Sequence, residues 1–165
     1  SRAKKGKADF LISIHADAFT DPSIRGATLY ALSDSRKVSK GSTYKIMYRP
    51  KTKTNIKLKS GISKRSISTL KTSQVDTYDQ SIEIGKHILN AMNKDVRLRK
   101  LTPREAAFAV LKSTEIASVL LEASYLSNKN DEAFLVNPQN QDKIAKAIVR
   151  GIKSYSSEAK QQLFK

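Results

Sequence analysis

The sequence predicts a layered α/β domain, and three observations support that fold class. Short apolar runs rich in β-branched residues are typical of buried strands. Apolar residues spaced three and four apart are typical of helices that pack one side against a sheet. These two patterns alternate along a chain of 165 residues, which is long enough for one domain with a hydrophobic core and too short for two.

Four apolar runs predict the strands. The first covers residues 8–14, and the second covers residues 26–32 after the turn signal Asp21-Pro22-Ser23. Two further strands are predicted near the middle of the chain, over residues 107–111 and 118–121. We expect these four segments to form the sheet.

Three segments predict helices. Residues 76–93 carry one apolar stripe, with acidic residues near the start and Lys94 after the end, the polarity that a helix dipole favours. A short helix is expected to open at Asn130-Asp131-Glu132 and to end near Asn137-Pro138. The last helix is predicted from Gln139 to Tyr155, and residues 156–165 are expected to form a polar tail.

The chain is strongly basic, with 31 Lys and Arg against 15 Asp and Glu and a formal net charge of +16. Residues 35–75 hold twelve of these basic residues and no acidic one. We expect a basic, mobile insertion there, made of loops with one helix near residues 42–48, because a like-charged segment repels itself. Such a charge suits nucleic acid, anionic lipid or an acidic cell-wall polymer.

The composition also excludes several classes of protein. There is no cysteine, hence no disulfide framework and no thiolate metal site. No apolar run reaches the roughly 20 residues of a transmembrane helix. The first residues do not resemble a signal peptide, so we expect the chain to begin within a domain or after processing.

Three residues are candidates for chemistry. His15 ends the first strand, at the kind of sheet rim where α/β proteins bind ligands, and Asp17 could orient its imidazole or bind the same ion. Glu122 directly follows a buried strand, where a carboxylate serves either a structural ion pair or general-base catalysis. The other histidine, His87, is expected to lie on the solvated face of its helix with Glu83, Asn90 and Lys94.

Five segments carry a family resemblance. Residues 7–19 (KADFLISIHADAF) resemble the segment of zinc-dependent N-acetylmuramoyl-L-alanine amidases that bears the second zinc histidine. Residues 26–33 and 107–113 are similar to two later segments of these enzymes, and residues 119–128 (VLLEASYLSN) match the motif that holds their catalytic glutamate. Residues 144–155 fit their last helix. The resemblance identifies residues 1–155 as a partial amidase catalytic domain of the cell-wall and cell-division type.

The resemblance implies a fold, a metal and a set of roles. The fold would be a mixed sheet flanked by helices and lacking the N-terminal strands of the family, which should leave part of the sheet unpaired. A zinc ion would be held by two histidines and a glutamate. His15 would be one ligand, Asp17 an additional candidate, and Glu122 the base that takes a proton from water. The first zinc histidine and the ligand glutamate have no counterpart in this chain.

The resemblance further implies the substrate and the setting. The bond cleaved would be the amide between N-acetylmuramic acid and L-alanine of the peptidoglycan stem peptide, in the periplasm or cell envelope of a bacterium. Peptidoglycan would be the partner, together with an activator protein. The alternative is a truncated, non-catalytic relative that binds anionic peptidoglycan through its basic surface. Nucleic acid is not expected, because no zinc finger, RNP-type aromatic pattern or basic recognition helix is present.

Overall fold

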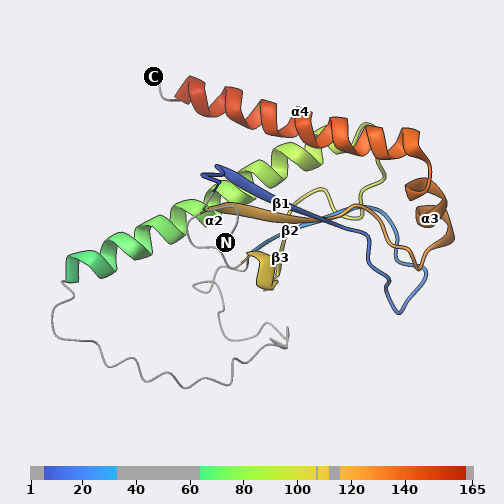
Figure 1. Cartoon of the computed structure of the whole chain (residues 1–165), viewed down its shortest axis with the longest axis horizontal. Coiled ribbons are helices and arrows are strands. Elements are labelled where there is room, and N and C mark those ends of the chain that lie inside the picture. The colour runs from blue at the N-terminus through green and yellow to red at the C-terminus, as the bar shows by residue number, and fades with distance from the viewer. Residues whose placement is uncertain (1–5, 33–63, 107, 112–115, 163–165) are drawn as a thin grey trace.

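The fold is organised around a four-stranded mixed sheet (Figure 1). The computed structural model describes residues 6–32, 64–106, 108–111 and 116–162. The strand order is β1-β4-β2-β3, with β1 parallel to β4, β2 antiparallel to β4, and β3 parallel to β2. The strands are β1 (Phe10–His15), β2 (Thr28–Leu32), β3 (Arg104–Ala106) and β4 (Ala117–Glu122). The predicted α/β class with a mixed sheet is confirmed.

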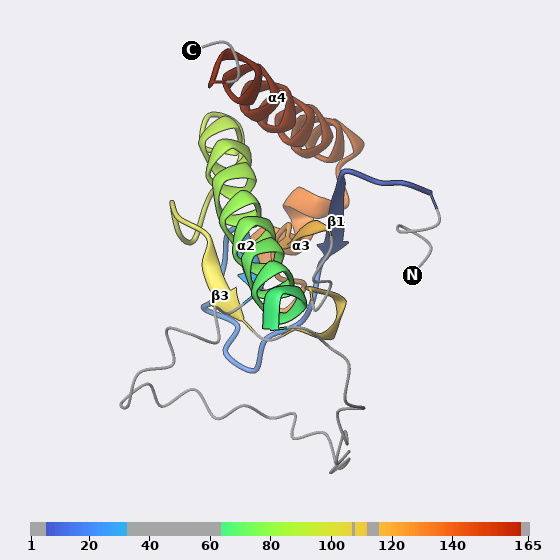
Figure 2. The same ribbon diagram turned by 90° about the vertical axis from the view of Figure 1, so that its left-hand side faces the viewer.

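Two long helices, α2 (Lys64–Met92) and α4 (Pro138–Gln162), pack against each other over one face of the sheet. Figure 2 looks along α2 and shows α4 beside it, above β1. The short helix α3 (Lys129–Leu135) links β4 to α4, and a 3-10 turn, η1 (Ala109–Leu111), precedes β4. None of the described helices combines the length and the apolar character needed to cross a bilayer.

The hydrophobic core lies between the sheet and these two helices. Alternate residues of β4 point into it, because successive side chains of a strand face opposite sides of the sheet. The core is formed by Ala27, Leu29, Ile84, Ile88, Leu89, Met92, Val96, Ala117, Val119, Leu121, Ala123, Ile144, Ala147 and Ile148. All six residues of β4 are buried, which identifies β4 as the central strand. The opposite face of the sheet therefore carries the remaining side chains, including Glu122.

Strand β1 lies at one edge of the sheet. Among the described residues it pairs only with β4. Ile14 lies two residues after Ile12, on the same face of the strand, yet Ile12 packs against the core whereas Ile14 is 58% exposed. A strand edge of this kind presents unpaired backbone N–H and C=O groups.

Two predicted elements differ from the structure. Helix α2 begins at Lys64 and not at residue 76. Its first twelve residues are rich in serine and threonine, which are weak helix formers, and carry no clear apolar stripe, so the sequence pattern gave no signal for this part of the helix. The strand predicted over residues 107–111 is wrong: residues 109–111 form η1, and the nearby strand is β3. A short apolar run does not by itself distinguish a strand from a helical turn.

Two further expectations concern the edges of the described chain. The last helix continues to Gln162, beyond the end predicted near Tyr155. The helix expected near residues 42–48 and most of the basic insertion lie outside the described residues.

Candidate functional site

The carboxyl ends of two parallel strands bring the candidate residues together. His15 ends β1, Glu122 ends β4, and the two are register partners although 107 positions separate them in the chain. The backbone N–H of Ala123 donates to the carbonyl of His15 at 2.9 Å, which continues the pairing beyond the strands. Thr28, the first residue of β2, lies opposite Glu122 on its other side. Three strands therefore converge at this point.

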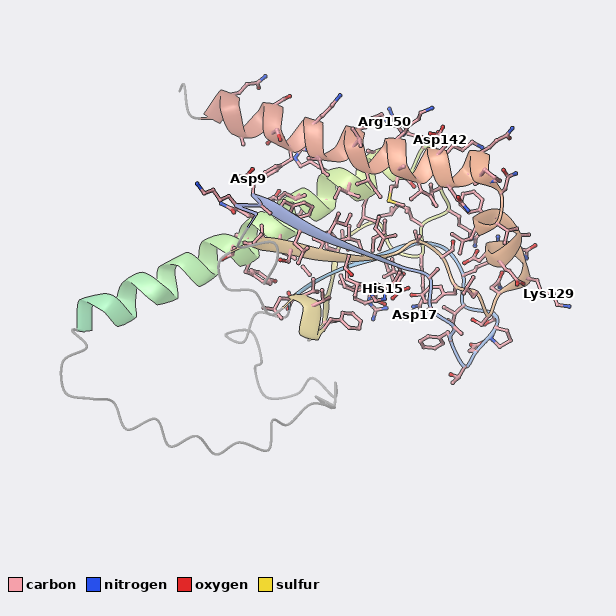
Figure 3. The ribbon with its side chains drawn as sticks, in the orientation of Figure 1. Asp9, His15, Asp17, Lys129, Asp142 and Arg150 are labelled. Atoms are coloured by element: carbon pink, nitrogen blue, oxygen red, sulfur yellow. The ribbon has the colours of Figure 1, made fainter. Side chains whose placement is uncertain are left out.

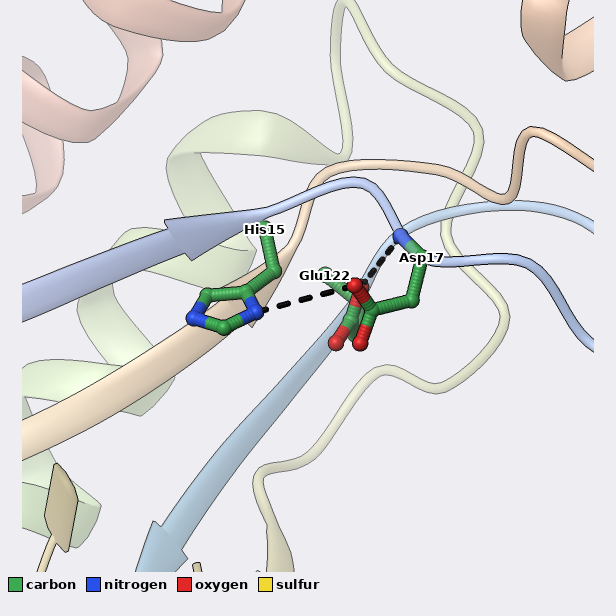
Figure 4. A group of neighbouring side chains, drawn as sticks. All are labelled: His15, Asp17 and Glu122. Carbon is green, nitrogen blue, oxygen red and sulfur yellow. Dashed lines mark hydrogen bonds and ion pairs between the residues drawn. The ribbon is translucent and has the colours of Figure 1, made fainter. Parts of the chain in front are cut away.

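Glu122 is buried, whereas its two neighbours are accessible to solvent. Glu122 is 4% exposed, while the side chains of His15 and Asp17 are 40% and 66% exposed. The backbone N–H of Asp17 donates to Oε2 of Glu122 at 3.2 Å, and Nδ1 of His15 lies 3.8 Å from Oδ1 of Asp17 (Figure 4). Figure 3 places His15 and Asp17 side by side on the sheet side away from α4. The site is thus open on the side of the histidine.

The surroundings of Glu122 favour its neutral form. Burial raises the pKa of the Glu122 carboxyl, since the charged form loses water, and the negative charge of Asp17 raises that pKa further. The N–H of Asp17 and the imidazole of His15 act in the opposite direction. A carboxyl with a raised pKa is suited to accept a proton near neutral pH.

The same three side chains fit a metal ion. One atom from each of His15, Asp17 and Glu122 can be chosen so that all three lie within 4.8 Å of one another. One imidazole nitrogen and two carboxylate oxygens are ligand types that zinc accepts. A cation would also relieve the repulsion between the two neighbouring carboxylates. The imidazole is oriented by Ser13, whose Oγ lies 3.0 Å from Nε2 of His15, so that Nδ1 faces the carboxylates.

Two tyrosines border the site and were not singled out from the sequence. The hydroxyl of Tyr125 donates to Oγ1 of Thr28 at 3.3 Å. Burial raises the pKa of Tyr30 to about 12, and its hydrogen bond to Tyr125 adds to this, while the charges of Arg104 and Arg99 partly offset both. Alternation along β2 places Thr28 and Tyr30 on the face of Glu122. The alternation along β2 identifies Thr28 and Tyr30 as neighbours of the site once it is known which face of the strand carries the site.

His87 lies elsewhere, and its expected exposure is wrong. The side chain is 19% exposed, because α4 covers the helix face that the sequence pattern assigned to solvent. Its Nδ1 lies 3.0 Å from Oγ of Ser154, and its Nε2 lies 3.3 Å from Oε2 of Glu158. The ring also packs edge-on against Tyr155. His87 therefore joins α2 to α4 on the helix side of the sheet, away from His15.

Comparisons with known proteins point to one family. The family profile of N-acetylmuramoyl-L-alanine amidases matches residues 1–154. The chain is 34% identical over 164 residues to the amidase AmiC of Escherichia coli and 36% identical over 156 residues to AmiA of Salmonella typhimurium. These alignments cover 96% and 93% of this chain, but only 38% and 54% of the relatives. The chain thus spans about half the length of these two proteins or less.

Solved structures share the fold. The N-acetylmuramoyl-L-alanine amidase from Clostridium difficile 630 aligns with a TM-score of 0.61 at 22% identity, over 94% of this chain and 62% of that one. The CwlD amidase from Clostridioides difficile, solved in complex with the GerS lipoprotein, aligns with a TM-score of 0.58 at 25% identity, over 91% and 55%. On the evidence of the profile and of these relatives, the chain belongs to the N-acetylmuramoyl-L-alanine amidase family.

Proposed function

We propose that this chain is the part of a peptidoglycan amidase that carries its general base and one zinc histidine. The reaction would be hydrolysis of the amide between N-acetylmuramic acid and L-alanine. The observation that carries the proposal is the buried carboxylate of Glu122, 4% exposed, beside the accessible imidazole of His15 at the ends of two parallel strands. Family membership gives the class of bond.

Glu122 would accept the proton of the attacking water. Its burial and the neighbouring charge of Asp17 raise the pKa of its carboxyl, so that the carboxylate is a stronger base than an exposed glutamate. The N–H of Asp17 holds one carboxylate oxygen and so fixes the orientation of the group. The protonated Glu122 carboxyl would then donate this proton to the amine of L-alanine as the amide bond breaks.

His15 and Asp17 would hold the zinc ion. The contact of Ser13 with Nε2 of His15 leaves Nδ1 directed toward the carboxylates, which supports that assignment. Zinc, when bound, acidifies a water molecule and polarises the amide carbonyl. Family zinc sites use two histidines and a glutamate, and within the described residues the site has one histidine, so the test requires the full-length protein.

The setting follows from the same family. We propose that the protein acts on peptidoglycan in the bacterial periplasm or cell envelope, as expected for relatives of AmiA and AmiC. The CwlD amidase was solved with a lipoprotein partner, which supports the proposal that a second protein controls this one.

The Glu122→Gln substitution tests the proposal. Glutamine keeps the size of the side chain and cannot accept the proton, so the release of stem peptides from purified murein should fall by about 10²–10⁴-fold. The rate is measured with the full-length, zinc-loaded protein. Glu83→Gln is the matched control, since Glu83 is exposed on α2 and pairs with Lys86 at 2.6 Å; its activity should equal that of the wild type. Unimpaired hydrolysis by the Glu122→Gln variant would rule out Glu122 as the general base.

The alternative is a non-catalytic protein that binds anionic peptidoglycan, and the net charge of +16 favours it. That alternative requires retention on murein without peptide release and without zinc in a metal analysis of the full-length protein. Stoichiometric zinc together with peptide release would exclude it.

A further inference from the structure

Two arginines border the site on the side away from His15. The register of the sheet forms a row on the site face that runs from His15 to Glu122 and then to Thr28. The segment around Leu98 lies beside β2, because Ala27 pairs with Leu98 in parallel. In this register the residue opposite Thr28 is Arg99, which continues the row. The backbone N–H of Arg99 donates to the carbonyl of Ala27 at 2.8 Å, so Arg99 stands beside Thr28.

A second row runs parallel to the first. Ser13 pairs with Leu120, Leu120 with Tyr30, and Tyr30 with Arg104. Residues paired directly across a sheet point to the same face, so Arg104 lies on the face of Tyr30. The next residue, Glu105, accepts a hydrogen bond from Tyr78 of α2 at 2.6 Å, on the opposite, helix-covered face. This alternation independently orients Arg104 toward the site.

The two guanidinium groups act on the same region. Leu98 packs against the core, and Arg99, the residue after it, carries a charge that reaches both Asp21 and Tyr30. The charge of Arg104 also reaches Tyr30. Both arginines are half-buried, and neither forms a salt bridge with a residue that the structure describes. Two positive charges thus lie beside the site on its face of the sheet, with Asp21 as an acidic neighbour of Arg99 but with no salt bridge between them.

We propose that Arg99 and Arg104 bind a carboxylate in the peptide arm of the substrate, an inference that rests on the proposed amidase function. Arginine binds carboxylates through paired, charge-assisted hydrogen bonds. Neighbouring strands lie about 4.8 Å apart, so the arginine side of the sheet is roughly 10 Å from Glu122. An extended peptide advances about 3.3 Å per residue, so the carboxylate belongs to one of roughly the first three residues after the scissile amide.

The two arginines would contact the peptide side of the substrate and not the glycan side. Glu122 and His15 mark where the amide must lie, and one side of that bond carries the sugar while the other carries L-alanine and the residues after it. A pair of cations about 10 Å from the amide can recognise an acidic peptide residue, which would set the specificity of the reaction. Tyr30, which is half-buried, lies between the two positions and would line the path of the peptide.

Binding of two matched peptides tests the inference. N-acetylmuramoyl peptides are compared that carry either a free side-chain carboxylate or its amide within the first three residues, with the scissile amide replaced by a non-hydrolysable ketomethylene group; hydrolysis is measured separately on the corresponding amides. Their dissociation constants are measured with full-length wild-type protein by calorimetry. The wild type should bind the acidic peptide about tenfold more tightly, and Arg99→Gln with Arg104→Gln should lose that preference while binding the amidated peptide as before.

Controls separate this inference from the proposed function. Arg150→Gln removes one charge on α4, where Arg150 bonds the carbonyl of Ala91 at 3.3 Å, and it should keep the preference. Equal weakening of both peptides by the double variant would overturn the carboxylate contact, and so would a wild type that does not discriminate. Preference for the acidic peptide without hydrolysis would uphold the contact and defeat the proposed activity. Hydrolysis without preference for the acidic peptide would support the proposed activity and overturn the carboxylate contact.

Discussion

At the scale of single residues, Asp131 connects the two loops that carry the site. Its carboxylate is 3% exposed, and its Oδ2 accepts hydrogen bonds from the N–H groups of Gly26 at 2.7 Å and Tyr125 at 3.1 Å. Gly26 ends the loop that begins after His15, and Tyr125 follows Glu122 by three positions. Asp131 therefore fixes both loops relative to each other.

The Asp131→Ala substitution should destabilise the protein strongly. It leaves two buried N–H groups without an acceptor, each of which costs about 1–3 kcal/mol, so the free energy of unfolding should fall by roughly 2–6 kcal/mol. Urea denaturation of the full-length protein measures the change. Asp142→Ala is the matched control, because Asp142 forms an exposed pair with Lys146 on α4 at 2.7 Å, and it should lower the free energy by only about 0.5 kcal/mol. Equal losses for both variants would contradict the role of Asp131.

At the scale of elements, the close packing of α2 and α4 depends on Gly151. A Cβ atom at this position would lie 2.5 Å from Cα and 2.8 Å from N of Ile88, and 2.9 Å from the carbonyl oxygen of His87. All three are backbone atoms and cannot rotate away. Only a glycine lets the two helices approach so closely over the core.

Gly151→Ala should therefore destabilise the protein, although alanine favours a helix over glycine by about 1 kcal/mol. The overlap with Ile88 must force the helices apart, which typically costs about 1–3 kcal/mol net. The measurement is the urea midpoint of the full-length protein. Ser156→Ala, at an exposed position on the same helix, should stay within about 0.5 kcal/mol of the wild type. A stabilised Gly151→Ala variant would mean that the helices separate without cost.

The elements also mark how far the sequence could predict the site. Apolar runs ending at His15 and before Glu122 predicted two buried strands. Both strands are present, but only β4 is buried along its whole length, because β1 lies at the edge of the sheet. Their adjacency depends on register across 107 positions, which no local pattern encodes. β3 is three residues long and begins with Arg104 and Glu105, so it offers no apolar signal. The position of Arg104 beside the site could not be foreseen for that reason.

At the scale of the whole molecule, the packing of helices against each other determines which polar residues are buried, and the helical pattern of the sequence does not show this. The periodicity of α2 separated an apolar from a polar face, yet it could not reveal that α4 covers His87 on the polar side. The predicted layers, the positions of β1, β2 and β4, and the last helix follow from local apolar patterns. The burial of Glu122 and the clustering of His15 and Asp17 around it arise only when the strands pair.

The charge of these 165 residues leads to a last prediction, on binding of the protein to the cell wall. A net charge of +16 should attract anionic peptidoglycan over long range, and salt screens this attraction over a Debye length of about 10 Å at 0.1 M and about 3 Å at 1 M. The fraction of full-length Glu122→Gln protein that sediments with murein sacculi should therefore fall steeply with salt. Chitin, an uncharged glycan, should retain little protein at any salt concentration. Sedimentation with sacculi that is unchanged up to 1 M salt would show that the basic surface does not hold the protein there.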